Sequence, residues 1–351
     1  MMDTICDLYL SDKHTQQQWQ SFLTDRGITN FNPQEVTTID QTIGLYNAEH
    51  QLVGTGSIAN NIIKFVAVCD QDAPTKGARF NQLISELTNR LGAQGIFHQF
   101  VFTKPAYIPS FQYVGFQLLG STEQGAILEK GVPNIKDYLA AIPKFPAAKK
   151  VAGIVLNANP FTNGHRYLVA EAAKQNDVVY VFVVNADVSL FSTAERFQLV
   201  REGTRDLANV VVVNGQDYLV SFVSFPAYFI KDNDAIIRYQ TELDASIFKQ
   251  QITPVLGITT RYLGSEPLSH TTALYNASLE RILTPSVAVK ILPRLTAGAQ
   301  VISASYVRQL IKAGTLADLA ALVPPTTLAF IQNNLLTLQT RISKGQNING
   351  N

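Results

Sequence analysis

The sequence predicts an α/β protein with two domains, an N-terminal α+β domain and a C-terminal domain built on an open parallel sheet. Three observations predict this arrangement. The chain has 351 residues, whereas one domain takes roughly 150. Short β-rich runs surround one strong helical pattern in the first half, and strand and helix patterns alternate in the second. Residues 141–150, between the halves, carry two prolines and no periodicity, which is typical of a linker.

The domain boundaries follow from composition. We expect one domain over residues 1–140, a second over 151–340, and a flexible tail over 341–351, where glycine and asparagine accumulate. Charge divides at the same place. Residues 1–148 carry a net charge of −3, and residues 149–351 carry +4.

The first half is predicted to be a sheet with one long helix. Apolar residues recur at helical spacing from Arg79 to Leu91, and Gly92 is expected to end that helix. Runs of β-branched and aromatic residues between turn residues predict strands at 43–46, 51–58, 62–68 and 96–102.

The second half is predicted to alternate strands and helices. Val151–Leu156 and Val178–Val184 are continuous apolar runs, as expected of parallel strands covered on both faces. The residues from His165 to Lys174 follow a helical pattern. A capping box from Ser192 to Glu195 predicts a helix that runs to about Asp206. Further strands are predicted at 209–213 and 261–263.

Composition excludes several classes of protein. An apolar content of 46% with 16% charged residues argues against a disordered chain. A net charge of +1 argues against an extended nucleic-acid or membrane-surface site. The two cysteines show no metal-ligand spacing, and no metal-binding protein site is expected. No signal peptide pattern and no membrane-length apolar run is seen, so we expect a cytoplasmic protein.

The loop after the strand at 151–156 carries the most informative chemistry. Ligands of open α/β sheets bind beyond the carboxyl ends of the strands, and a helix N-terminus there favours an anion. Gly164 permits close approach of a ligand to the backbone. His165 can donate a hydrogen bond to a phosphate whose charge grows during reaction. The loop itself is rich in polar residues: Asn157, Asn159, Thr162 and Asn163.

Two motifs link this loop to a superfamily. Thr162-Asn163-Gly164-His165 resembles the T/H-x-G-H signature of nucleotidyltransferases, with a threonine where many members have a first histidine. Farther along the chain, Ile302 to Arg308 resembles the I-S-S-T-x-x-R motif of the same superfamily. Ser303 can cap the following helix, and Ser305 and Arg308 share one helical face. The pair of motifs predicts a polyphosphate site.

Longer segments resemble the citrate lyase ligase family across about residues 1–340. They are NANPFTNGHRYLV, SLFSTAERFQLV, FPAYFIKDND and ISASYVR, in this order. The resemblance implies a GNAT-like (acetyltransferase-like) domain followed by a Rossmann-like nucleotidyltransferase domain. It also implies an AMP-forming acid–thiol ligase that converts acetate and ATP to acetyl-AMP and pyrophosphate. The acetyl group then passes to the CoA-derived prosthetic-group thiol of the citrate lyase acyl carrier protein, and Mg²⁺ is expected with the phosphates.

The resemblance also implies roles for individual residues. His165, Thr162 and Arg308 are the expected catalytic residues, the first two near the α-phosphate. Ser303, Ser305 and Arg308 are expected to hold the β- and γ-phosphates. The remaining expected ATP contacts are Asn157, Asn159, Pro160, Phe161, Gly164, Gly264, Ser265 and Glu266. Three further candidates are Arg196, Lys231 and Gly77.

Structural explanations remain open for several of these residues. Arg196 can pair with neighbouring glutamates, and Lys231 lies among aspartates in a solvated charge cluster. His165, Ser303 and Ser305 can each serve as helix caps. Gly77 belongs to a stretch, Gln71–Phe80, that matches the pyrophosphate-binding loop of GNAT enzymes only in part, so CoA-dependent transfer by this domain is not favoured.

Two other functions also remain open. One is an adenylyltransferase acting on a phosphopantetheine-like acceptor. The other is a non-catalytic nucleotide-binding or carrier-docking protein.

Overall fold

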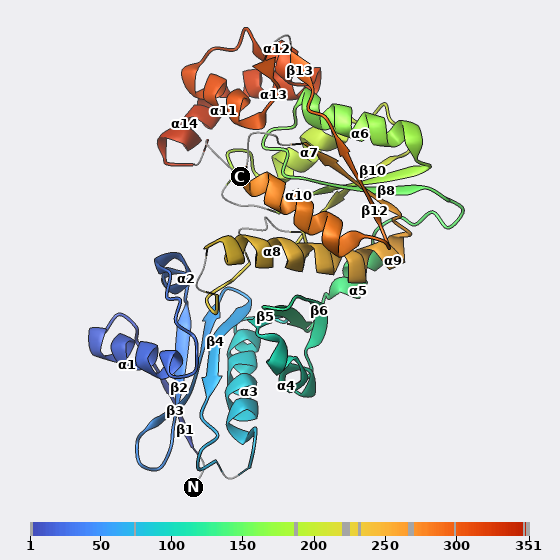
Figure 1. The fold of residues 1–351 in the computed structure, drawn as a ribbon. Helices are drawn as coiled ribbons and strands as arrows, with labels where there is room; N and C mark the ends of the chain where they lie inside the picture. Colours follow the sequence, from blue (N-terminus) through green and yellow to red (C-terminus); the bar gives the residue numbers. More distant parts are fainter. Residues whose placement is uncertain are drawn as a thin grey trace. The chain divides into compact units, whose positions relative to one another are not determined.

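A computed structural model describes residues 3–73, 75–185, 189–219, 225–230, 233–265, 270–297, 300–346 and 348. Contacts divide the chain into two units, each with its own sheet (Figure 1). The N-terminal unit comprises Met1–Leu139 and Phe225–Gln250, and the C-terminal unit comprises Ala140–Ser224 and Gln251–Asn351. The first is α+β and the second contains a parallel sheet, which confirms the predicted fold class.

The N-terminal unit contains a seven-stranded sheet in the order β1-β2-β3-β4-β5-β7-β6. Neighbouring strands are antiparallel except β4 and β5, which run parallel. The strands are β1 (Thr4–Asp7), β2 (Gln41–Tyr46), β3 (Leu52–Ala59), β4 (Ile62–Val68), β5 (Gln99–Thr103), β6 (Gln117–Ser121) and β7 (Ala126–Lys130). The helices are α1 (Lys13–Thr24), α2 (Pro33–Thr37), α3 (Ala78–Ala93), η1 (Pro105–Tyr107), α4 (Ile108–Tyr113), α5 (Ile135–Ala140) and α8 (Asn233–Ile247).

The core of this unit lies on both faces of its sheet, and a bulge in β4 places two alternate residues of that strand on opposite faces. Ile63 and Phe65 are two residues apart and would share a face of a regular strand. Instead, Ile63 packs with the apolar face of α3, and Phe65 packs with that of α1. Phe65 has φ +54°, and the pairing of β3 with β4 shifts register there. The extra residue of the bulge turns Phe65 to the α1 side.

A segment from the second half of the sequence, Phe225–Ile230, completes this α1-side core. The ring of Tyr228 lies 4.3 Å from that of Phe65 on β4, and its hydroxyl donates to the carbonyl of Phe102 on β5, 2.8 Å away. The amide of Ala227 donates to the Glu35 carboxylate at 3.1 Å. This insertion is not predicted from the sequence, because local periodicity carries no information about pairing between distant segments.

The C-terminal unit contains a five-stranded parallel sheet in the order β10-β9-β8-β11-β12. Its strands are β8 (Val151–Leu156), β9 (Val178–Val183), β10 (Val210–Asn214), β11 (Thr260–Gly264) and β12 (Ala288–Leu292), and a small hairpin follows as β13 (Thr296–Ala297) and β14 (Gln300–Val301). Its helices are α6 (Asn163–Gln175), α7 (Thr193–Gly203), η3 (Phe248–Ile252), α9 (Thr253–Leu256), α10 (His270–Leu283), α11 (Ala304–Ala313), α12 (Leu319–Leu322), α13 (Pro325–Asn333) and α14 (Leu335–Ser343), with η3 at the border of the two units.

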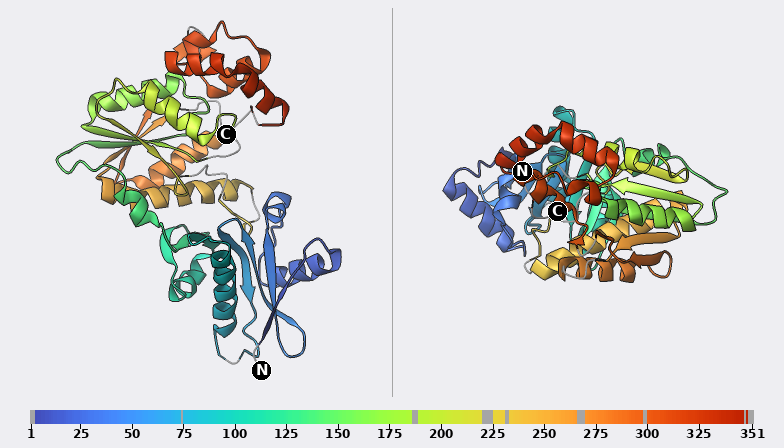
Figure 2. Two further views of the ribbon diagram at one scale, coloured as in Figure 1. Left: turned by 180° about the vertical axis from the view of Figure 1, so that it is seen from behind. Right: turned by 90° about the horizontal axis from the view of Figure 1, so that it is seen from above.

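Helices cover both faces of this sheet. Helices α6 and α7 lie on one face and α10 on the other (Figures 1 and 2). From β8 the chain proceeds outward through β9 to β10, and it then returns to β11 on the other side of β8. The strand order therefore reverses between β8 and β11, which is where such sheets bind ligands.

Most predicted elements appear with small differences at their ends. Helix α3 continues past Gly92 because Gly95, with φ +78°, supplies the left-handed residue that closes the helix. The strand predicted from residue 96 accordingly begins at Gln99. In the described part of the chain, no helix is long and apolar enough to span a membrane.

The Tyr228 contact predicts how the stability of the N-terminal unit depends on residue 228. Tyr228→Ala should lower the free energy of unfolding by about 3–5 kcal/mol through the cavity it leaves. Tyr228→Phe should lower it by about 1 kcal/mol through loss of one hydrogen bond. Fluorescence of Trp19, the single tryptophan, reports on this core in a urea titration, since its ring lies 5.2 Å from Phe65. Tyr113→Ala is the control, because Tyr113 is 81% exposed. Equal midpoints for Tyr228→Ala and Tyr113→Ala would contradict this packing.

Candidate active site

The loop after β8 is closed by a cap that involves His165. Thr162 is the N-cap of α6, and its hydroxyl accepts a hydrogen bond from the amide of His165 at 3.3 Å. In return, the amide of Thr162 donates to Nδ1 of His165 at 3.0 Å. This is a capping box in which an imidazole replaces the usual glutamate. The predicted cap function of this histidine is therefore present, and it coexists with a place in the cavity described below.

The cap fixes the tautomer of His165. Because Nδ1 accepts the Thr162 amide, the neutral ring carries its proton on Nε2. Burial, and then the charges of Arg294 and Arg308, lower the pKa of His165 to about 4. At neutral pH the ring is thus an uncharged hydrogen-bond donor. The ring of Phe161, itself fully buried, stacks on it at 5.9 Å.

Two buried arginines, Arg196 and Arg308, bind the backbone of the loop between β8 and α6. Arg196 on α7 donates through Nη1 to the carbonyl and the side-chain oxygen of Asn157, at 2.8 and 3.0 Å. Arg308 on α11 donates through Nη1 to the carbonyl of Asn159 at 2.5 Å. Both side chains are 0% exposed. They fix the backbone between β8 and α6, where Ala158 takes the strained φ of +50°.

A cavity of about 410 Å³ opens in front of this loop, over the carboxyl ends of β8, β11 and β12. It thus lies at the reversal of strand order. Residues of β8, its loop and α6 form one wall: Val155, Leu156, Asn157, Ala158, Asn159, Thr162, Gly164, His165, Tyr167 and Leu168. The other walls come from the remaining elements: Tyr262, Leu263, Gly264, Tyr275, Asn276, Leu292, Pro293, Arg294, Leu295, Ile302, Ser303, Ala304 and Ser305.

The cavity is suited to an anion. The first turn of α6 borders it at Gly164 and His165, and the first turn of α11 borders it at Ser303 and Ser305. Helix N-termini present unpaired amides and a positive dipole end. Among the lining residues that the structure describes, Arg294 is the one with a permanent charge. The described walls contain no carboxylate.

The structure brings together eight of the predicted site residues along this cavity: Asn157, Asn159, Thr162, Gly164, His165, Gly264, Ser303 and Ser305. Four others do not line the cavity. Arg196 and Arg308 are buried and bind the loop carbonyls described above, and Pro160 and Phe161 are buried as well. Ser265 is adjacent to Gly264, and its carbonyl accepts a hydrogen bond from Arg294 at 3.0 Å. Glu266 and Lys231 fall outside the described residues.

Gly77 belongs to the N-terminal unit. It precedes α3 with φ +80°, and a Cβ at this position would meet no atom within 4 Å. Glycine is therefore required there by backbone conformation and not by space. A role for Gly77 in ligand binding stays a prediction.

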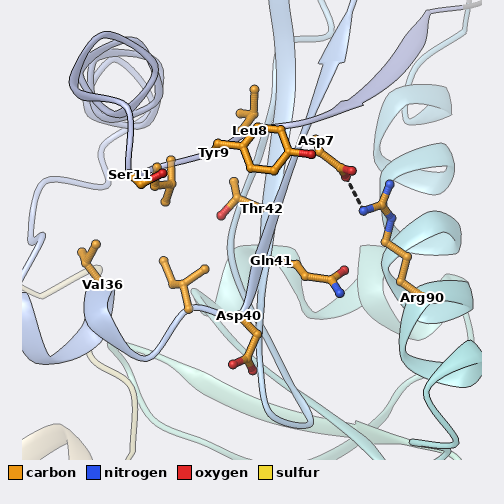
Figure 3. Close-up of a pocket in the computed structure, with 11 residues that line it drawn as sticks. Asp7, Leu8, Tyr9, Ser11, Val36, Asp40, Gln41, Thr42 and Arg90 are labelled. Atoms are coloured by element: carbon orange, nitrogen blue, oxygen red, sulfur yellow. Dashed lines mark hydrogen bonds and ion pairs between the residues drawn. The ribbon is translucent and has the colours of Figure 1, made fainter.

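A second cavity, of about 460 Å³, lies in the N-terminal unit between the end of β1, α2 and the start of β2. Figure 3 shows the Asp7 carboxylate directed at the guanidinium of Arg90, with which it forms an ion pair. Arg90 also binds Glu86 at 2.8 Å, and Asp40 accepts the amide of Asn60. The charged groups that line this second cavity thus have partners within the chain. Neither Thr162–His165 nor Ile302–Arg308 lines it. We therefore place the site in the C-terminal unit.

Arg294 is the functional candidate that sequence reasoning missed. It follows β12, a five-residue strand of which every residue is exposed or partly exposed. The available signal was positional, because a basic residue directly after a parallel strand lies at the ligand-binding edge of the sheet. Tyr275 and Asn276 were missed in the same way, since α10 carries no recognisable motif.

Comparison with known proteins matches residues 151–331 to the citrate lyase ligase C-terminal domain family. The chain is similar to the citrate [pro-3S]-lyase ligase of Escherichia coli (strain K12), with 36% identity over 319 residues, 88% of this chain and 90% of that protein. It is 31% identical to a phosphopantetheine adenylyltransferase of Thermobifida fusca over 143 residues, 37% of this chain and 84% of that protein. An acetyltransferase of the GNAT family from Staphylococcus aureus MU50 matches with 12% identity and a TM-score of 0.29, over 37% of this chain and 99% of that structure.

The depressed pKa of His165 predicts a specific pH dependence of stability. The folded state holds this ring neutral down to about pH 4, whereas the unfolded chain protonates it near 6.5. The unfolded state therefore binds more protons between these values, and stability falls as pH falls through this window. His165→Asn keeps an oxygen that can accept the Thr162 amide but does not titrate. Urea unfolding at pH 7.5 and 5 should show a loss about 2 kcal/mol larger for the wild type than for this variant, since pH 5 lies about 1.5 units below the pKa of the unfolded chain. Equal losses would contradict the assigned ring state.

Proposed function

This chain belongs to the citrate lyase ligase family, and from that premise we propose that it is an ATP-dependent acid–thiol ligase that acetylates the citrate lyase acyl carrier protein. ATP binds in the cavity of the C-terminal unit, acetate is activated as acetyl-AMP, and the CoA-derived prosthetic-group thiol of the carrier takes the acetyl group. The observation that carries this assignment is the neutral, Nε2-protonated His165 beside two helix N-termini.

In the first step an acetate oxygen attacks the α-phosphorus of ATP. A new oxygen–phosphorus bond forms, the bond between the α-phosphorus and its bridging oxygen breaks, and pyrophosphate leaves. Charge grows on the α-phosphate oxygens as this happens. The Nε2–H of His165 can donate to such an oxygen without giving up its proton, because the ring is a neutral donor. The protein thus contributes positioning and charge stabilisation.

The two helix N-termini receive the rest of the triphosphate. The N-termini of α6 and of α11 border the cavity at Gly164, Ser303 and Ser305, and a helix N-terminus favours a bound anion. A Cβ on Gly164 would meet no atom closer than 3.6 Å, so the fold leaves room there that a ligand can use. The Ser305 hydroxyl accepts from Arg308 at 3.0 Å, so its own proton remains to be donated. These groups suit the β- and γ-phosphates and, later, the pyrophosphate.

In the second step the prosthetic-group thiol attacks the acetyl carbon. A carbon–sulfur bond forms, the carbon–oxygen bond to the phosphate breaks, and AMP leaves while the thiol proton is released. The carrier protein is therefore the acceptor, and its arm must reach the cavity mouth. Acetate, AMP and the thioester all pass through the same space beside His165.

ATP is expected to enter as its magnesium complex. In the part of the chain that the structure describes, no cluster of three or more potential metal ligands occurs. The described cavity walls offer amides and hydroxyls instead of carboxylates. Such walls fit a magnesium ion held mainly by the phosphates and water, as is usual for Mg²⁺ at nucleotide sites.

The alternative of an adenylyltransferase acting on a phosphopantetheine-like acceptor is not favoured. Similarity to such an enzyme covers 37% of this chain, whereas similarity to the citrate lyase ligase covers 88%. A non-catalytic role is opposed by the cavity with its capped histidine. Pyrophosphate exchange into ATP separates the three functions. Dependence on acetate supports the ligase, dependence on phosphopantetheine alone supports the adenylyltransferase, and no exchange supports a binding protein.

Substitution of His165 tests the mechanism. His165→Asn should lower acetate-dependent exchange by about 10²-fold, because it lacks a donor at the Nε2 position. His165→Gln is the matched variant, since its amide N–H can reach toward the position of Nε2–H, and it should retain more activity. Both variants should still bind ATP. Full turnover by folded His165→Asn would show that the imidazole does not act on the reacting phosphate.

A further inference from the structure

Arg294 occupies a distinctive position in the proposed ATP site. It follows β12 at the carboxyl edge of the sheet and lines the cavity together with His165 and Ser303. Its Nε donates to the carbonyl of Ser265 at 3.0 Å, which ties it to the loop after β11. The side chain is half-buried, and desolvation lowers the pKa of its guanidinium. The Nε of the guanidinium is thus bound to backbone, and the residue also lines the cavity.

Arg294 supplies positive charge to a cavity that has to hold a negatively charged triphosphate. A triphosphate brings several negative charges into a space whose described walls otherwise supply amides, hydroxyls and amide side chains. Helix N-termini offer partial charges, equivalent to roughly half an elementary charge each. A full positive charge at the wall has a larger effect on a phosphoryl group in such a partly dry site. Within the described walls, Arg294 supplies that charge.

Arg308 has a different environment, although the superfamily motif places it among the phosphate contacts. Its Nη1, Nη2 and Nε donate to the Asn159 carbonyl, the Ser305 hydroxyl and the Ile348 carbonyl, at 2.5, 3.0 and 3.0 Å. The side chain is 0% exposed, and burial lowers its pKa to about 10. Its planar fork is therefore used to join three segments of backbone and helix.

We propose that Arg294 is the cationic residue that contacts the reacting phosphates, and that Arg308 is a positioning residue that holds the loop carrying His165. This inference rests on the proposed function of the cavity. It divides between two arginines the roles that the motif assigns to one. The depressed pKa of His165, to which Arg294 contributes more than Arg308, agrees with an Arg294 guanidinium close to the imidazole.

Paired substitutions at the two positions test the division. At position 294 charge should matter more than shape, because a lysine can still serve a phosphate as a point charge. Arg294→Gln should lower acetate-dependent pyrophosphate exchange by about 10²-fold, and Arg294→Lys by about 10-fold or less. At position 308 shape should matter more than charge. Arg308→Lys and Arg308→Gln should lower the melting temperature by similar amounts.

Calorimetry of ligand binding and NMR titration of His165 measure quantities that would not change if Arg294 had only a structural role. Calorimetry should show that Arg294→Gln weakens binding of ATP but leaves adenosine binding unchanged. In the NMR titration of the His165 imidazole, Arg294→Gln should raise the pKa toward the value of a free histidine, and Arg294→Lys should not. Wild-type ATP affinity and exchange in Arg294→Gln would overturn the proposal, as would equal weakening of ATP and adenosine.

These results are separable from the proposed function. Absence of acetate-dependent exchange in the wild type would refute the ligase assignment. The ATP and adenosine titrations and the His165 titration would still decide whether Arg294 meets the phosphates. Conversely, normal exchange in the wild type and in Arg294→Gln would refute the role of Arg294 alone.

Discussion

Two buried guanidinium groups hold the carbonyl oxygens of the loop after β8, and the geometry of the site depends on them. Arg196 and Arg308 come from helices far apart in the sequence, and they fix Asn157 and Asn159. A buried charge is costly unless its donors are satisfied, and backbone carbonyls satisfy them here. Removing either arginine would leave buried carbonyls unpaired, which is strongly destabilising. The loop between β8 and α6 is therefore held in one conformation before any ligand binds.

This restraint determines the chemistry available at the cavity. The fixed loop presents Thr162 as the cap of α6, and the cap orients His165 and decides which nitrogen carries its proton. The N-termini of α6 and of α11 both border the cavity. Preorganised donors of this kind cost no reorganisation when charge develops on a phosphate. Among the cavity-lining residues that the structure describes, the site thus combines neutral donors with one permanently charged side chain, that of Arg294.

Elements set by neighbouring residues were predicted from the sequence, and contacts between distant segments were not. Strand β8, the His165 helix and the capping box at Ser192 are set by neighbouring residues, and they were predicted closely. The eight residues gathered at the cavity come from motifs at strand and helix ends. The packing of Tyr228 into the N-terminal unit depends on a bulge in β4 and a partner about 160 residues away, and no periodicity encodes it. Arg294 was not identified because the short strand β12 before it, which has no fully buried residue, was not predicted.

In the proposed reaction, acetate attacks the α-phosphorus of ATP in the cavity beside His165. The most direct measurement uses acetate labelled with ¹⁸O in both oxygens, together with ATP and the thiol form of the carrier protein. Mass spectrometry of the products then locates the label. If acetyl-AMP forms, AMP must retain one acetate oxygen when the thiol takes the acetyl group. We predict singly labelled AMP and unlabelled pyrophosphate. Unlabelled AMP, or label in pyrophosphate or phosphate, would contradict this mechanism.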